Sequence, residues 1–253
     1  MARVIAVVSG KGGVGKTTVT ANLGIVLGAT GYKVTLIDAD VGLNNLDIAL
    51  GLEDRVVYDI FDVIAGRVLP EEALIKSEEY PGIGLLPSVK GSDGIKAAAF
   101  QAITEIYAKD ADYVLIDAPA GVEAGFHRAV SAAKEVIIVT TPNLSAVKDA
   151  DRTLETLSVY DAEVCGLVVN RVIPERVQRG EAVSGERIAE LMRLKLLGEL
   201  PESDEISINS LFSAHSQSGQ AYFRLAEAVV SGKEAYRVGE RKRGFSLFGR
   251  RRR

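Results

Sequence analysis

The chain is poor in the side chains that form disulfides and metal clusters. Its 253 residues include one cysteine, two histidines and no tryptophan. The single Cys165 excludes an intrachain disulfide and suits a reducing compartment. It also argues against iron–sulfur clusters held by Cys-x-x-Cys pairs. His127 and His215 lie far apart in the sequence without ligand-like neighbours, so we expect surface or helix-packing roles for both.

Long apolar segments are also missing. No apolar run approaches the roughly 20 residues that a membrane-spanning helix needs, and no signal-peptide pattern precedes the first predicted strand. We therefore expect a cytoplasmic protein that is soluble or peripheral on a membrane. A hydrophobic content of 47% is enough for one sizeable core. The pattern predicts a single domain over residues 1–232 and a flexible basic tail over residues 233–253.

Basic charge is concentrated in that tail. Residues 241–253 contain seven arginines or lysines and no acid, which leaves 23 basic against 34 acidic side chains in residues 1–240. An acidic body is a poor match for nucleic acid, so we predict no nucleic-acid partner. Three apolar residues among the arginines, Phe245, Leu247 and Phe248, favour an interfacial anchor on anionic lipids. A solubilising tail and a nucleic-acid-binding arm are the alternatives.

Apolar runs of strand type alternate with amphipathic stretches along residues 1–232. The predicted strands are 4–8, 34–37, 83–86, 113–116, 136–140, 164–169 and 196–200. The predicted helices lie near 17–29, 95–107, 124–133, 146–159, 185–193 and 219–231. This alternation predicts an α/β fold, a doubly wound and mostly parallel sheet with helices on both faces. Such sheets bind ligands at the carboxyl ends of their strands, where the candidate functional residues follow here: Gly10, Asp38, Asp117, Asn170 and Pro201.

Residues 10–18 read GKGGVGKTT and fit the phosphate-loop pattern G-x-x-x-x-G-K-[ST]. A predicted strand precedes the loop and a predicted helix follows it, as this motif requires. Glycines allow successive backbone N–H groups to point at phosphate oxygens, Lys16 would reach the β- and γ-phosphates, and Thr17 would bind Mg²⁺. We predict a nucleotide site made by Gly10, Lys11, Gly12, Gly13, Val14, Gly15, Lys16, Thr17 and Thr18.

Acidic residues end two of the predicted strands. Asp117 follows the apolar run 113–116 in the manner of a Walker B aspartate, which holds Mg²⁺ through water. Asp38 and Asp40 close the second strand two residues apart, and the alternation of an extended chain places both on one side, facing the phosphates. Capping of the strand end is the alternative for both.

The second lysine of the loop, Lys11, resembles the deviant Walker A signature of the MinD/ParA family of ATPases. The resemblance implies an ATP-dependent homodimer in which Lys11 reaches the phosphates of the other subunit. It also implies that Lys11, Lys16 and Asp40 serve hydrolysis, with Asp40 orienting the attacking water. The metal site that it implies consists of Thr17, Asp38, Asp40 and Asp117. A solvated loop lysine is the alternative for Lys11.

Further positions match the family less specifically. Asn170 and Arg171 resemble its adenine-recognition position, and Pro201 with Glu202 resembles the segment beside the base. An αL turn residue is the alternative for Asn170. The region of Asn45 resembles the first switch segment. Helix residues Asp149 and Asp151 resemble the dimer and partner surface, although a helix capped by Ser145 also explains acids at this place.

The resemblance covers essentially the whole chain and is greatest to the family members that position the division septum. It implies a slow, Mg²⁺-dependent ATPase that is stimulated by a partner and sits on the inner face of the cell membrane when ATP is bound. Its implied partners are a MinC-like division inhibitor and a MinE-like or other topological regulator. A flagellar-number regulator of the same family and a ParA-like DNA-segregation ATPase are the alternatives, the latter disfavoured by the acidic body.

Overall fold

An eight-stranded sheet runs through the computed structural model, which describes residues 1–41, 45–88, 94–209, 211–213, 215–232 and 238. The spatial order of the strands is β3-β4-β2-β5-β1-β6-β7-β8, and every pairing except β3 with β4 is parallel. The strands are β1 (Arg3–Val8), β2 (Val34–Asp38), β3 (Ile75–Lys76), β4 (Ile83–Leu86), β5 (Tyr113–Asp117), β6 (Glu135–Thr140), β7 (Glu163–Val172) and β8 (Leu196–Pro201).

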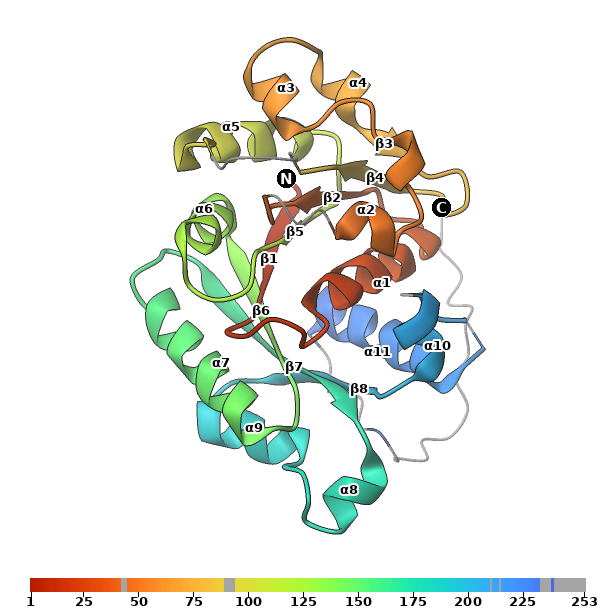
Figure 1. The fold of residues 1–253 in the computed structure, drawn as a ribbon, viewed down its shortest axis with the longest axis vertical. Helices are drawn as coiled ribbons and strands as arrows, with labels where there is room; N and C mark the ends of the chain where they lie inside the picture. Colours follow the sequence, from red (N-terminus) through yellow and green to blue (C-terminus); the bar gives the residue numbers. More distant parts are fainter. Residues whose placement is uncertain (42–44, 89–93, 210, 214, 233–237, 239–253) are drawn as a thin grey trace.

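Helices cover both faces of the sheet (Figure 1). Those of the described residues are α1 (Lys16–Ala29), α2 (Leu46–Ala49), α3 (Ile60–Ile64), α4 (Pro70–Ala73), α5 (Ala97–Tyr107), α6 (Ala124–Ala132), α7 (Leu144–Leu157), α8 (Pro174–Gln178), α9 (Gly185–Met192), α10 (Asp204–Asn209) and α11 (Gln217–Ser231), with a 3₁₀ turn at Glu53–Arg55. Helices α5, α6, α7 and α9 pack on one face, and α1, α2 and α11 pack on the other. None of the described helices is long and apolar enough to cross a membrane.

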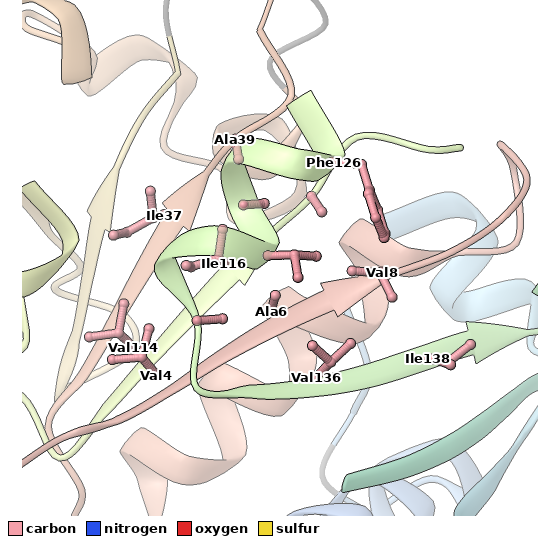
Figure 2. Packing of buried hydrophobic residues seen from close by; sticks show 14 of the residues in the cluster. Val4, Ala6, Val8, Ile37, Ala39, Val114, Ile116, Phe126, Val136 and Ile138 are labelled. Atoms are coloured by element: carbon pink, nitrogen blue, oxygen red, sulfur yellow. The ribbon is translucent and has the colours of Figure 1, made fainter. Parts of the chain in front are cut away.

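The central strands are apolar at successive positions because both of their faces are buried. In β1, Val4, Ala6 and Val8 face the α6 side, where Phe126 lies beside Val8 (Figure 2), whereas Ile5 and Val7 face α1. Branched side chains suit such strands, since they pack densely on a pleated surface. This double burial fixes the register of β1 against β5 and β6 and so holds the loops at its carboxyl end.

The predicted fold class is confirmed, and each predicted strand and helix lies within three residues of an observed element. Two local interpretations were wrong. Asn170 does not follow the strand but lies inside β7, which continues to Val172. Helix α7 begins at Leu144 and is capped by Asn143, whose side-chain oxygen accepts the N–H of Ser145 at 2.9 Å, so Ser145 is not the cap.

The division into a domain over 1–232 and a tail over 233–253 stays a prediction. Residues 233–237 and 239–253 lie outside the described residues, and so do the predicted anchor residues Phe245, Leu247 and Phe248. Val238 is described, and its backbone N–H donates to the Glu199 carboxylate at 2.9 Å.

Candidate nucleotide site

The loop between β1 and α1 has the backbone of a phosphate cradle. Gly13 and Gly15 adopt φ values of 78° and 88°, which glycine tolerates and other residues rarely do. Gly15 begins α1 without a side-chain cap, so the positive end of the helix is left to an incoming anion. A Cβ at residue 15 would lie 2.3 Å from Nδ2 of Asn170. Both conformation and packing therefore require glycine there.

Asp117 gathers three side chains of α1 at the bottom of this loop. Its carboxylate accepts hydrogen bonds from Lys16 Nζ at 2.8 Å, Thr17 Oγ1 at 2.6 Å and Thr20 Oγ1 at 3.1 Å. Lys16 and Asp117 are both buried, and such an ion pair is tolerated only when further hydrogen bonds satisfy it. The structure thus brings together the predicted residues Lys16, Thr17 and Asp117. It adds Thr20, which sequence reasoning missed although Lys16 and Thr20 are four residues apart and so share a helix face.

Asp38 stands beside Asp117, because β2 and β5 are neighbours and these two residues are register partners. Its oxygens accept the backbone N–H groups of Asp40 at 2.8 Å and Leu46 at 3.2 Å. Burial, reinforced by the charge of Asp117, raises the pKa of Asp38 to about 7. Asp38 therefore organises the loop that follows β2, and its predicted role in supporting Mg²⁺ stays a prediction.

Asp40 lies at the mouth of the same site and is half-buried. Burial raises its pKa, the charge of Lys16 opposes that shift, and the charge of Asp117 adds to it. The carboxyl group of Asp40 is thus close enough to interact electrostatically with both Lys16 and Asp117. This placement suits a group that acts on a molecule bound at the loop.

The raised pKa of Asp38 has a consequence for stability. The folded state holds this proton more tightly than the unfolded state, so the stability it contributes is complete below the unfolded pKa near 4 and is lost as the pH rises through about 7. We expect the nucleotide-free protein to gain roughly 1 kcal/mol from this group between pH 8 and pH 6. Urea unfolding of wild type and Asp38→Asn at both pH values measures it. A gain of equal size in the variant would contradict the assignment.

Backbone hydrogen bonds join the three loops of the site. The N–H of Ala39 donates to the Asp117 carbonyl at 3.0 Å, and the N–H of Gly121 donates to the Ser9 carbonyl at 3.0 Å. Between these bonds, the N–H of Ala118 donates to the Val7 carbonyl at 3.1 Å. The loop after β5 is therefore tied on one side to the phosphate loop and on the other to the loop after β2.

A cavity of about 120 Å³ adjoins the phosphate loop at the ends of β7 and β8. The predicted adenine residues Asn170, Arg171, Pro201 and Glu202 line it, together with Gly15, Thr18, Ser203 and Ile206. The amide of Asn170 donates to the Val14 carbonyl at 2.9 Å, so it also supports the loop. The αL residue here is Arg171, with φ 59°, rather than Asn170. Its side chain lies 3.9 Å from the Glu202 carboxylate.

Helix α7 packs directly on the start of the phosphate loop. A Cβ at Gly10 would lie 2.1 Å from the carbonyl oxygen of Asp149, and Lys11 Nζ lies 3.3 Å from Ser145 Oγ. Lys11 and Asp151 are exposed, whereas Asp149 is half-buried. A cleft of about 680 Å³ separates this corner from α8, and Lys11, Ser145 and Arg176 are among its lining residues.

Asn45 is set apart from α7. It is exposed at the start of α2, next to Leu46, whose N–H binds Asp38. The roles predicted for Lys11, Asn45, Asp149 and Asp151 at a subunit or partner surface stay predictions.

Strand order, loop conformation and buried ion pair together define the class of the protein, a P-loop NTPase whose phosphate loop carries an additional exposed lysine. A family model of the ParA type, described as "NUBPL iron-transfer P-loop NTPase", matches residues 1–230. The chain belongs to the MinD/ParA family of P-loop NTPases.

Its relatives are septum site-determining proteins. MinD of Synechocystis sp. is 49% identical over 212 residues, which cover 83% of this chain and 80% of the relative. MinD of Thermotoga maritima is 44% identical, covering 83% and 79%. Among solved structures, MinD in the Aquifex aeolicus MinC:MinD complex is 39% identical with a TM-score of 0.85, covering 92% and 97%. MinD of Pyrococcus horikoshii with Mg-ADP is 31% identical with a TM-score of 0.81, covering 91% and 97%. These matches favour the division-site branch over the two alternatives.

Proposed function

We propose that the chain is an ATP-dependent dimerising switch that associates with the membrane and positions the division site by recruiting a division inhibitor. One observation carries the proposal beyond family membership: the phosphate loop and α7 form a single packed unit. Gly10 contacts the α7 backbone, and the exposed Lys11 reaches Ser145 in its first turn. A change at the bound nucleotide can therefore alter the position of α7, and with it the surface that contacts a second molecule.

ATP and Mg²⁺ are the ligands of this site, and the residues present fit both. The glycine-rich backbone and the uncapped start of α1 suit phosphates. Lys16 and Thr17, now bound to Asp117, are placed to exchange that carboxylate for phosphate and metal. Hydroxyl and carboxylate oxygens are the ligands Mg²⁺ prefers, and the metal neutralises charge that develops on the phosphates. Asp40 orients the attacking water, and Asp38 holds the loop that carries Asp40.

The exposure of Lys11 supports dimerisation, because its side chain can exchange the hydrogen bond to Ser145 for phosphates bound by a second copy. The face of α7 with Asp149 and Asp151, together with Asn45, then forms the dimer and partner surface. The solved Aquifex aeolicus complex contains MinC with MinD, and we assign a MinC-like inhibitor to this chain by that likeness. A MinE-like or other topological regulator would accelerate the otherwise slow hydrolysis and return the protein to the cytoplasm.

Membrane binding is assigned to the basic tail. Each basic residue near an anionic leaflet contributes about 1 kcal/mol, and ordering a flexible segment costs roughly 1–2 kcal/mol per residue. One tail should consequently bind weakly, whereas the two tails of a dimer bind multivalently. ATP would in this way control residence on the membrane.

Removing residues 241–253 is expected to abolish ATP-dependent binding to anionic vesicles and to leave ATP hydrolysis nearly unchanged, because the tail lies outside the nucleotide site. Co-sedimentation with vesicles, with a purified MinC-like inhibitor present, measures both membrane binding and recruitment. The inhibitor should sediment only with the full-length chain and Mg-ATP.

A matched pair of variants separates apolar insertion from charge. Phe248→Glu should lose vesicle binding because it places a charge at the acyl boundary, whereas Phe248→Leu should retain it. Raised salt should weaken binding to anionic vesicles, and neutral vesicles should bind poorly. Equal sedimentation of the truncated and full-length chains would overturn the anchor, and sedimentation with nonspecific DNA instead would favour the segregation alternative.

A further inference from the structure

A guanidinium group on α6 is buried against the backbone of the loop that carries Asp40. Arg128 lies on α6, the helix that follows the Asp117 loop, and its side chain is 3% exposed. Its Nη2 donates to the carbonyl oxygen of Ala39 at 3.2 Å, and its Nη1 donates to the carbonyl oxygen of Ile95 at 3.3 Å. The guanidinium also lies 5.8 Å from the centre of the Phe100 ring.

The position of Ala39 gives this contact its significance. Ala39 separates Asp38 from Asp40 and is itself buried. Its N–H donates to the Asp117 carbonyl, and its carbonyl accepts from Arg128. Both backbone polar groups of Ala39, the N–H of the link to Asp38 and the carbonyl of the link to Asp40, are thus held by the segment that runs from β5 into α6. Figure 2 shows Ala39 just beyond the end of β2, next to α6.

Helix α6 packs tightly against the loop that follows Asp117. A Cβ at Gly125 would lie 2.5 Å from Pro119 Cγ and 3.5 Å from Arg128 Nη2, so the helix, the loop and the guanidinium are in close contact. The loop and α6 are therefore packed as one unit, and Arg128 joins this unit to the Ala39 carbonyl.

Burying a positive charge is costly unless hydrogen bonds and an aromatic face compensate for it. The fork of an arginine can donate to two carbonyl groups at once, whereas a lysine offers a single ammonium centre. A hydrophobic residue would fill this space at lower cost. The residue is hence better explained by what it positions than by packing.

We propose that Arg128 is a positioning residue for ATP hydrolysis, which couples the Asp117 loop to Asp40. Its guanidinium holds the Ala39 carbonyl, and through it the backbone of Asp40, in the place required to orient the attacking water. The inference rests on the proposed function, because it requires Asp40 to act on water at the phosphate loop.

The experiment compares steady-state ATP hydrolysis by wild type, Arg128→Lys and Arg128→Gln. Misplacing a catalytic group by about 1 Å can cost up to 100-fold, so we expect kcat to fall about tenfold or more in both variants while KM for ATP changes by less than about twofold. Thermal melts establish that the variants fold, and Arg128→Lys, which keeps charge and most of the volume, carries the test if Arg128→Gln does not fold. Arg187→Gln, an exposed arginine on α9, is the matched control and should match wild type.

A double-mutant cycle with Asp40→Ala, followed by single-turnover hydrolysis of labelled ATP, identifies the route. If Arg128 acts through Asp40, adding Arg128→Lys to Asp40→Ala should reduce the rate by less than about twofold further. A further tenfold loss, wild-type kcat in both Arg128 variants, or a parallel loss of ATP affinity would each overturn the proposal. No hydrolysis by the wild-type chain, with or without its partners, would instead contradict the proposed function.

Discussion

Lys11→Ala is expected to retain ATP binding and to lose the ATP-dependent dimer. The amine of Lys11 is exposed, and the hydrogen bond that the structure gives it is the one to Ser145. Phosphate binding within the subunit instead depends on the buried Lys16 and the loop backbone. Across a subunit boundary, a lysine bound to phosphate makes charge-assisted hydrogen bonds that a methyl group cannot replace. Sedimentation velocity with Mg-ATP, alongside a fluorescence titration of nucleotide, measures both quantities.

Two further variants serve as controls for Lys11→Ala. Lys109→Ala removes an equal charge from an exposed position between α5 and β5, away from the phosphate loop, and should dimerise normally. Lys16→Ala should weaken nucleotide binding, hydrolysis and dimerisation together, because the lysine for the phosphates is lost and the buried Asp117 loses its countercharge, keeping the hydroxyls of Thr17 and Thr20. A Lys11→Ala protein that still dimerises with ATP would return this residue to a solvated loop lysine.

Asp40→Ala should slow hydrolysis by about 100-fold or more while changing the affinity for ATP only slightly. Orientation of water matters in the transition state, so its loss appears in kcat rather than in binding. Removing a carboxylate beside the phosphate site also removes repulsion, which works against any loss of affinity. The ATP-bound dimer should persist longer, since hydrolysis is the step that releases it.

Single-turnover hydrolysis and nucleotide titration test this expectation, with Asp54→Ala, which removes an exposed acid from the 3₁₀ turn at Glu53–Arg55, as the control. Normal turnover by Asp40→Ala would place the catalytic role elsewhere and leave Asp40 as a residue that closes β2.

Local spacing explains how far the sequence could predict this site. The phosphate loop is a contiguous pattern between a strand and a helix, and Asp117 follows an apolar run, so both were identifiable without the fold. Thr20 could have been found from its spacing to Lys16. Arg128 could not, because its carbonyl partners lie 89 and 33 residues away in the sequence, and a basic residue on an amphipathic helix ordinarily faces water.

The edge strand β3 and several short helices were missed for a different physical reason. Strand β3 has two residues and pairs antiparallel with β4. Two residues are too few to show the alternation of apolar and polar side chains by which a strand is recognised in a sequence. Helices α2, α3, α4 and α8 have four or five residues each, less than the span over which an apolar stripe repeats. Asn170 was misplaced because β7 continues beyond its apolar run, through the αL residue Arg171 to Val172.

The close approach of Gly10 to α7 changes how substitutions in this loop should be understood. Any side chain at residue 10 would collide with the Asp149 carbonyl and with Thr153 Oγ1, 2.8 Å away. Intolerance at a phosphate-loop glycine is expected where a side chain would block contact between the backbone and phosphate. At Gly10, a loss of function on substitution would instead reflect disturbed packing of α7 against the loop. A variant at Gly10 could bind nucleotide normally, yet nucleotide binding would no longer change the partner surface on α7.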